Sequence, residues 1–123
     1  MNNDQSLENQ VKIQRNYYKH NANEYDSLHL NGEEDEHDFA LYWLSGLLKK
    51  NNVKNILDIG SGTGRVIQLL NDLNPNVKII GIEPSPELRE IGYKKGISNK
   101  LLIDGNGLNL DYPAKSFDMV CEF

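Results

Sequence analysis

The stretch that decides the fold is ILDIGSGTGR, residues 56–65, in which an apolar run ends in glycines at every second position. The run VKNILDI is short, apolar and rich in β-branched residues, which predicts a buried strand. Glycine is the residue of choice where the backbone needs a positive φ, or where a ligand approaches closer than a Cβ permits. Gly60, Gly62 and Gly64 therefore predict a turn shaped around a bound ligand. A tight turn that needs glycine for packing alone is the alternative, and a single glycine would suffice for it.

Strands and helices alternate on the C-terminal side of this turn. Apolar residues at helical spacing follow the glycines and stop before Pro75. A second helix starts with Ser85 as N-cap and Pro86 in first position, and Gly96 closes it. The expected strands are residues 53–59, 77–83, 100–104 and 117–123, with a helix-free loop before the last. This alternation predicts an α/β fold with a parallel sheet, right-handed crossovers and flanking helices. We expect the four strands in the order 3-2-1-4.

Two segments precede the first strand. Residues 1–32 form a polar, partly helical leader with a short helix expected over 11–18, and residues 33–123 form the ligand-binding domain. A helix is predicted over 39–48, after the acidic run NGEEDEHD and before the basic KKNN. Its apolar residues recur at spacings of three and four: Phe39, Tyr42, Trp43, Leu44, Leu47 and Leu48.

Composition narrows the function classes. The chain has 123 residues, a net charge of −5 and 38% hydrophobic residues, so it is one ordinary globular domain. The acidic balance argues against nucleic acid as a partner. We find no signal peptide and no apolar run of about 20 residues, which predicts a cytoplasmic protein. The lone Cys121 lies in an apolar run and is interpreted as a small core residue.

The glycine spacing separates two classes of nucleotide ligand. Dinucleotide-binding turns favour G-x-G-x-x-G, whereas here Arg65 stands where the last glycine of that pattern would be. Glu83 ends the second strand, at roughly the 20-residue distance at which an acid binds ribose hydroxyls in nucleotide-binding folds. The alternative for Glu83 is an exposed strand-end acid, and in either role we expect its removal to leave stability unchanged.

Two more polar residues are candidates for ligand contacts. The amide of Asn106 suits an adenine edge, although a turn asparagine between Gly105 and Gly107 is the alternative. Asp58 either steadies the glycine turn by accepting backbone N–H bonds or contacts a positively charged ligand group. The histidines, residues 20, 29 and 37, lack metal-ligand spacing, so we predict no metal site. No nucleophile or acid–base constellation is evident.

Together, ILDIGSGTGR, IIGIEPS and GNGLNLDYPAKSFDMV resemble the successive motifs of class I S-adenosylmethionine-dependent methyltransferases, in their small-molecule-type branch. The resemblance covers residues 33–123 and implies a Rossmann-like fold with S-adenosylmethionine as cofactor. It implies that the glycine turn holds the methionine and ribose parts, Glu83 the ribose hydroxyls and Asn106 the adenine amine, where the family more often has Asp. The residues implied for the cofactor are Asp58, Gly60, Ser61, Gly62, Gly64, Glu83, Pro84, Asn106 and Gly107.

The same resemblance suggests that Tyr25 matches a tyrosine of the leading helix that can fold over the cofactor, with a packing tyrosine as the alternative. It implies methyl transfer to a small-molecule acceptor that the sequence does not identify, and no catalytic base is assigned. Two alternatives stay open: a non-enzymatic nucleotide-binding or pairing module, and an NAD-dependent oxidoreductase. We expect the chain to be a C-terminally truncated, inactive cofactor-binding part that self-associates through the bare edge of its fourth strand.

Overall fold

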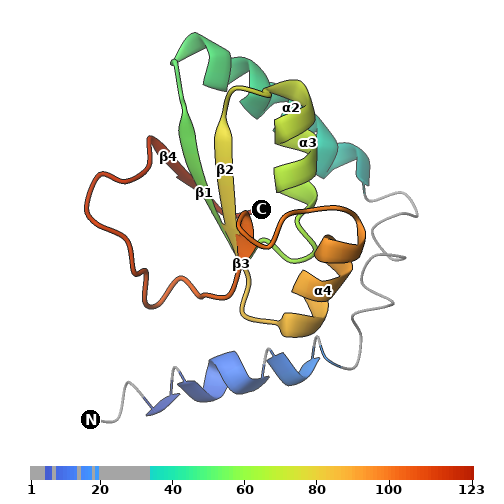
Figure 1. Ribbon diagram of the computed structural model, residues 1–123, viewed down its shortest axis with the longest axis vertical. Helices are drawn as coiled ribbons and strands as arrows, with labels where there is room; N and C mark the ends of the chain where they lie inside the picture. The colour runs from blue at the N-terminus through green and yellow to red at the C-terminus, as the bar shows by residue number, and fades with distance from the viewer. Residues whose placement is uncertain (1–4, 7, 14, 18, 20–33) are drawn as a thin grey trace.

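A four-stranded parallel sheet forms the centre of the molecule (Figure 1). The computed structural model describes residues 5–6, 8–13, 15–17, 19 and 34–123. The strands are β1 (Asn55–Ile59), β2 (Lys78–Ile82), β3 (Leu102–Ile103) and β4 (Met119–Cys121). Their order is β3-β2-β1-β4, which confirms the predicted order and the parallel sheet.

The outer strands are shorter than predicted, since β3 has two residues and β4 three. At the start of β1, the backbone N–H groups of Lys54 and Asn55 donate to Asp118 Oδ2, at 2.8 and 2.9 Å. The Asp118 side chain therefore ties the start of β1 to the residue directly before β4. From there β4 pairs in register with β1, so that Asp58 lies opposite Cys121.

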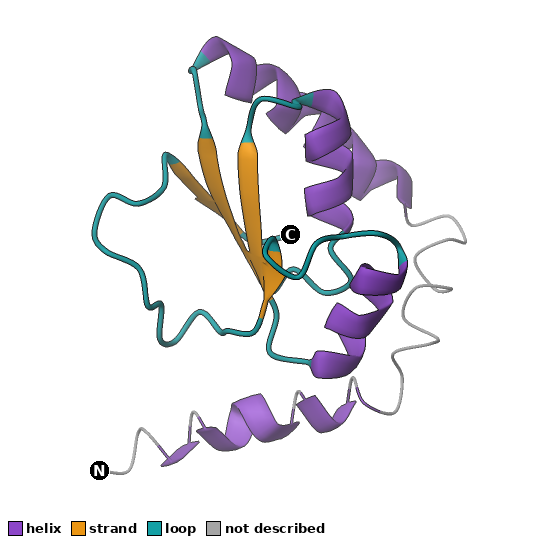
Figure 2. Cartoon of the chain, in the orientation of Figure 1, coloured by secondary structure: helices purple, strands orange, loops and turns teal. Residues whose placement is uncertain are grey.

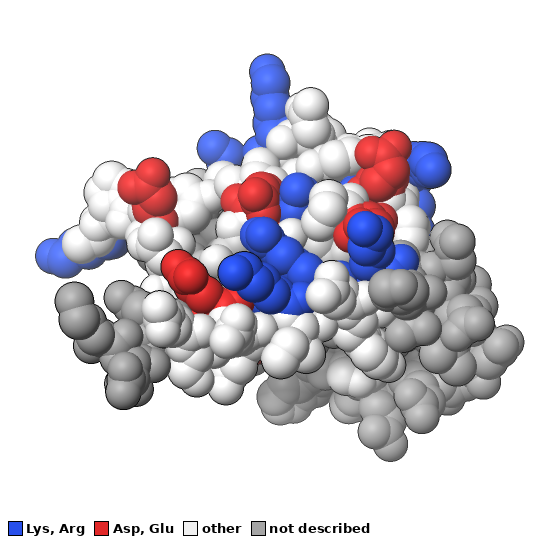
Figure 3. Space-filling view, turned by 90° about the horizontal axis from the view of Figure 1, so that it is seen from below, with Lys and Arg blue, Asp and Glu red and all other residues white. Residues whose placement is uncertain are grey.

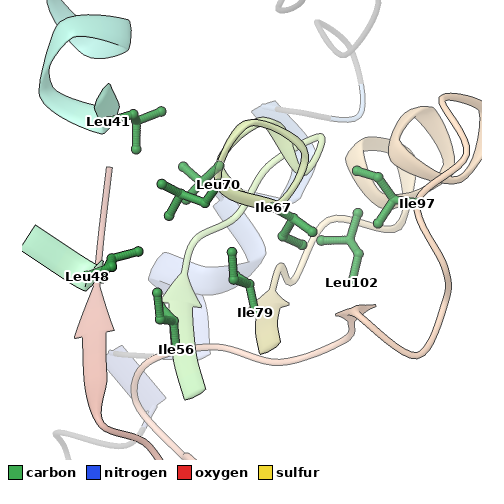
Figure 4. Packing of buried hydrophobic residues seen from close by; sticks show 9 residues of the cluster. Leu41, Leu48, Ile56, Ile67, Leu70, Ile79, Ile97 and Leu102 are labelled. Atoms are coloured by element: carbon green, nitrogen blue, oxygen red, sulfur yellow. The ribbon is translucent and has the colours of Figure 1, made fainter. Parts of the chain in front are cut away.

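Three helices cover one face of the sheet: α2 (Glu34–Lys50), α3 (Arg65–Leu73) and α4 (Pro86–Lys94) (Figure 2). The predicted N-cap and first residue of α4 are confirmed, since Ser85 Oγ accepts the N–H of Leu88 and Pro86 is the first helical residue, whereas the C-cap residue is Lys95 and not the predicted Gly96. Gly96 lies one position beyond the cap residue Lys95 and has a left-handed φ of 97°. Figure 4 looks into the apolar layer between the helices and the sheet.

Helix α2 begins at Glu34, before the predicted start at residue 39, so residues 34–38 of the acidic run belong to its first turns. Most of the apolar residues that gave it a helical period lie off its buried face, although Leu48 is buried and Leu44 half-buried. Leu41, Ser45 and Leu48 are buried, whereas four of those apolar side chains are exposed: Phe39, Tyr42, Trp43 and Leu47. Each set forms its own stripe along the helix, with residues spaced three or four apart. The stripe of Leu41, Ser45 and Leu48 is the one that is buried, because α2 packs against α3.

The described residues between 5 and 19 are helical, so the leader helix starts before the predicted position 11. It lies across the end of the sheet where the strands finish (Figure 1), and Arg15 is 3.6 Å from Asp104, the residue after β3. Tyr25, His20 and His29 lie outside the described residues. In the described part of the chain, no helix is both long and apolar enough to cross a membrane.

Candidate functional site

The glycine turn after β1 has the conformation that its sequence predicts. Gly60, Gly62 and Gly64 have φ values of 71°, 56° and 82°, in the left-handed region that L-residues rarely adopt. The N–H groups of Gly60 and Ser61 both donate to the carbonyl of Ile82 at 3.0 Å, which ties the turn to the end of β2. A Cβ built on Gly60 would meet nothing within 4 Å, so its α-carbon faces open space.

Glu83 is not the exposed strand-end acid that the sequence left open. Its side chain is buried, with 3% of the residue exposed, and its carboxylate joins two elements. Oε2 accepts the N–H of Gly62 at 2.9 Å, and Oε1 accepts the N–H of Ser85 at 2.8 Å. Burial raises the pKa of Glu83 above its usual value, while these two bonds act in the opposite direction. The expectation that removing Glu83 leaves stability unchanged assumed a surface acid, and that assumption is wrong.

Asp58 steadies the glycine turn through a hydroxyl group. Its Oδ2 accepts the Ser61 hydroxyl at 2.6 Å, and Cys121 Sγ lies 3.6 Å from Oδ1. Burial raises the pKa of Asp58 from 3.8 to about 6, because a charged carboxylate is poorly solvated there. Burial, and then the Asp58 charge, raise the pKa of the Cys121 thiol to about 12. Cys121 packs half-buried against the core, as the sequence predicts.

Asn106 forms the turn that was the alternative to a ligand contact. Its Oδ1 accepts the N–H of Leu108 at 3.0 Å, a local side-chain turn typical of asparagine. The glycines on either side bring this loop close to the sheet. A Cβ on Gly105 would lie 3.3 Å from Ile82 Cβ, and one on Gly107 would lie 3.1 Å from Ile59 Cγ2. The loop after β3 therefore passes directly over the ends of β1 and β2.

A pocket opens beside the glycine turn, between it, α2 and the end of the chain. The lining residues outside the turn itself include His37, Leu41, Asp58, Arg65 and Phe123. Arg65 forms an ion pair with Asp38 of α2. In the sequence, His37 was considered only as a possible metal ligand and was not predicted to lie here. The only feature of the sequence that pointed to a charged pocket here was Arg65, a large cation directly after the last glycine.

A second hollow lies between the leader helix and the loop after β3. Glu8, Val11, Lys12 and Arg15 form one wall, and residues of the Asn106 loop form the other. Pro84 is buried and lines a neighbouring depression together with Arg15 and Arg89. Figure 3 views the molecule from this side and shows basic and acidic side chains gathered over the central part of the face. Arg89 lies 3.1 Å from Asp104, which also pairs with Arg15.

The predicted site residues thus follow three successive strands and lie at the end of the sheet where those strands finish. Asp58 and the glycine turn follow β1, Glu83 and Pro84 follow β2, and the Asn106 loop follows β3. Among the described residues, no group of three or more His, Cys, Asp or Glu side chains could hold a metal ion.

The chain is similar to known methyltransferases in sequence and in fold. It is 33% identical over 88 residues to demethylmenaquinone methyltransferase of Geobacillus stearothermophilus, a match that covers 65% of this chain and 38% of that protein. The protein of the same name from Thermotoga maritima is 31% identical over 74 residues, covering 60% of this chain and 32% of its own length. The chain therefore spans less than half the length of these relatives.

Solved structures show the same Rossmann-like fold. The plantazolicin methyltransferase BpumL in complex with SAH matches with a TM-score of 0.65 and 21% identity, over 95% of this chain and 50% of that one. The sugar N-methyltransferase KedS8 from Streptoalloteichus matches with a TM-score of 0.60 and 23% identity, over 80% and 39%. The family profile described as "Methyltransferase domain" matches residues 56–123, more than half of the chain. The chain belongs to the methyltransferase domain family.

Proposed function

We propose that this chain binds S-adenosylmethionine and serves a methyltransferase that acts on a small-molecule acceptor. The observation that carries the proposal is the contact between Glu83 and Gly62. It brings the acid after β2 and the glycine turn after β1 to one edge of the sheet, where α/β folds bind their ligands. The names of the curated relatives and the SAH bound to BpumL support the same cofactor class.

The residues present fit such a cofactor. The α-carbon of Gly60 faces open space, which leaves room for a ligand close to the backbone. Each Glu83 oxygen accepts one backbone N–H, and a carboxylate has about four acceptor sites, so ribose hydroxyls could still donate to it. We assign the methionine end to Asp58, Gly60, Ser61, Gly62 and Gly64, the ribose to Glu83 and Pro84, and the adenine to Asn106 and Gly107.

In this assignment the protein contributes orientation and electrostatics. The sulfonium of the bound cofactor supplies an activated methyl group, so the chain needs no nucleophile or metal of its own. The buried Glu83 carboxylate holds the glycine turn to the start of α4, which keeps the methionine and ribose contacts at a constant separation. The turn needs left-handed φ values at its three glycines, and most other residues adopt such values only with strain. Rate acceleration then comes from holding the methyl group in line with the acceptor.

Location and self-association are further parts of the proposal. A cytoplasmic location is supported by the lone Cys121, which can form no internal disulfide. In the described part of the chain, β4 pairs only with β1, and Val120 and Phe123 are 54% and 45% exposed. We expect this edge to pair with another chain, as bare strand edges do. Analytical ultracentrifugation tests this, and a monodisperse monomer at high concentration would contradict it.

Isothermal titration calorimetry with S-adenosylhomocysteine and, separately, NAD tests the cofactor. We expect saturable binding of the first at one site and no heat from the second, because Arg65 occupies the position of the third dinucleotide glycine. Gly62→Val should abolish binding, since it places a β-branched residue at a φ of 56° against the ligand. NAD binding equal to or tighter than that of S-adenosylhomocysteine would refute the proposal.

A further inference from the structure

The side of helix α2 that faces away from the core is apolar. Leu41 and Leu48 belong to the buried layer between the helices and the sheet (Figure 4). Phe39 and Trp43 lie on the opposite side, where 68% and 69% of these residues are exposed, and Leu47 continues their row at 44%. We call Phe39, Trp43 and Leu47 the outer stripe. A contiguous row of large apolar side chains in water is typical of an interaction surface.

We propose that the outer stripe binds the outer stripe of a second copy of this chain, with the two α2 helices antiparallel about a two-fold axis at Trp43. The stripe lies on a helix, so this contact differs from pairing along the edge of β4. It also does not depend on the cofactor, and binding of S-adenosylhomocysteine neither supports nor contradicts it.

The order of residues along α2 suits an antiparallel pair. In a two-fold interface, a residue a given number of positions before the axis meets the residue the same number of positions after it on the other copy. Phe39 and Leu47 lie four positions before and after Trp43. With Trp43 on the axis, each Phe39 therefore meets a Leu47, and apolar side chains contact apolar side chains along the whole stripe.

Two small residues on the same side of α2 leave room for the partner helix. Ala40 and Gly46 are exposed and lie three positions before and after Trp43. Gly46 has an ordinary helical backbone, and a Cβ built on it would meet nothing within 4 Å. Glycine destabilises a helix interior relative to alanine, yet neither φ nor packing in the described part of the chain requires it here. Small residues in these places let the indole of the second copy lie against the helix backbone.

The charges at the two ends of α2 favour the same arrangement. The helix begins with the acidic sequence EDE, residues 34–36, and ends with Lys49 and Lys50. An antiparallel pair places the basic end of each helix beside the acidic start of the other and opposes their dipoles, whereas a parallel pair would bring like charges together. An acidic start also makes an anionic membrane surface a poor occupant of the stripe.

The emission of Trp43 tests the proposal, because this is the only tryptophan of the chain. One pair of 17-residue helices buries less than the roughly 1,600 Å² of a standard interface, so we expect weak association. Over protein concentrations from about 1 µM to 1 mM, the emission should shift to the blue in step with a doubling of mass in sedimentation equilibrium. Pairing through the edge of β4 would double the mass without this shift.

Two neighbouring lysines provide a matched pair of variants. Lys50 lies seven positions, or two turns, after Trp43 and therefore on the stripe, whereas Lys49 is turned away from it by about 100°. Lys50→Glu should weaken the dimer about fivefold or more, since the new charge meets the acidic start of the other helix at both ends of the interface. Lys49→Glu changes the net charge equally and should alter the dissociation constant by less than about twofold.

Gly46→Gln tests the close approach of the helices. Glutamine is a better helix former than glycine, so this variant should unfold at a higher temperature when monomeric. It should nevertheless weaken the dimer about tenfold or more, because its side chain fills the space for the indole.

Three results would overturn the inference. The first is a Trp43 emission that stays constant over the whole concentration range, whether or not the mass increases. The second is an equal effect of Lys49→Glu and Lys50→Glu, or unchanged association of Gly46→Gln. The third is a blue shift that requires anionic lipid vesicles, which would assign the stripe to a membrane surface instead.

Discussion

Replacing Asp58 with asparagine removes a charge from one of the least exposed positions in the chain. Only 1% of this residue is exposed, and burial raises the pKa of its carboxyl from 3.8 to about 6. A raised acid pKa means that the folded protein holds its proton where the unfolded chain has released it. Stability contributed by this protonated form is therefore present at low pH and is lost as pH rises from about 4 to 6.

The size of the effect follows from the two pKa values. One pKa unit corresponds to about 1.36 kcal/mol, so the difference between 3.8 and about 6 corresponds to roughly 3 kcal/mol. Asp58→Asn keeps an oxygen that can accept the Ser61 hydroxyl but never ionises. We expect the two proteins to be similarly stable near pH 4, and the variant to be more stable at pH 7 by up to about 3 kcal/mol.

Urea denaturation followed by circular dichroism at several pH values between 4 and 7 measures this difference directly. The difference between variant and unmodified chain isolates residue 58, because the other titrating groups are common to both. A difference that stays constant with pH would refute the argument that burial disfavours the charged carboxylate. A more stable variant that binds S-adenosylhomocysteine less well would show that the acid is kept for its ligand.

Three further predictions use other groups of the same site and core. Glu83→Ala should cost about 2 kcal/mol or more of unfolding free energy, because two buried N–H groups lose their acceptor, and it should weaken S-adenosylhomocysteine binding; unchanged denaturation would contradict this. Gly92→Ala should lower the free energy of unfolding by about 1–3 kcal/mol, because the new Cβ would lie 2.8 Å from the carbonyl oxygen of Thr63. Gly46→Ala is the control: its Cβ would meet nothing within 4 Å, so it should stabilise α2 by about 0.5–1 kcal/mol. Equal thermal shifts for these two variants would contradict the packing argument. The thiol of Cys121 should react with iodoacetamide at pH 8 at least about a hundredfold more slowly than in urea, because its pKa is about 12, and mass spectrometry of the alkylated chain measures the rate.

Local sequence patterns determined the parts of this protein that depend on neighbours along the chain. Alternating apolar runs and turns predicted the strands and helices, since side-chain periods of 2 and 3.6 follow from backbone geometry alone. The three glycines predicted a left-handed turn, because few other residues accept those φ values, and the structure has that turn. The parallel direction of the strands followed from the helices that connect them, and the observed order β3-β2-β1-β4 agrees with the predicted one.

Contacts between distant segments were decided only by the tertiary structure. The sequence showed Glu83 as an acid at a strand end, but its burial and its bond to Gly62 depend on how close β2 lies to the glycine turn. The pattern of α2 offered two apolar stripes, and packing against α3 selected Leu41 and Leu48 over Trp43. His37 likewise reaches the pocket only because α2 lies beside α3. Side-chain burial is a property of the neighbours that cover a residue, and those neighbours come from elsewhere in the chain.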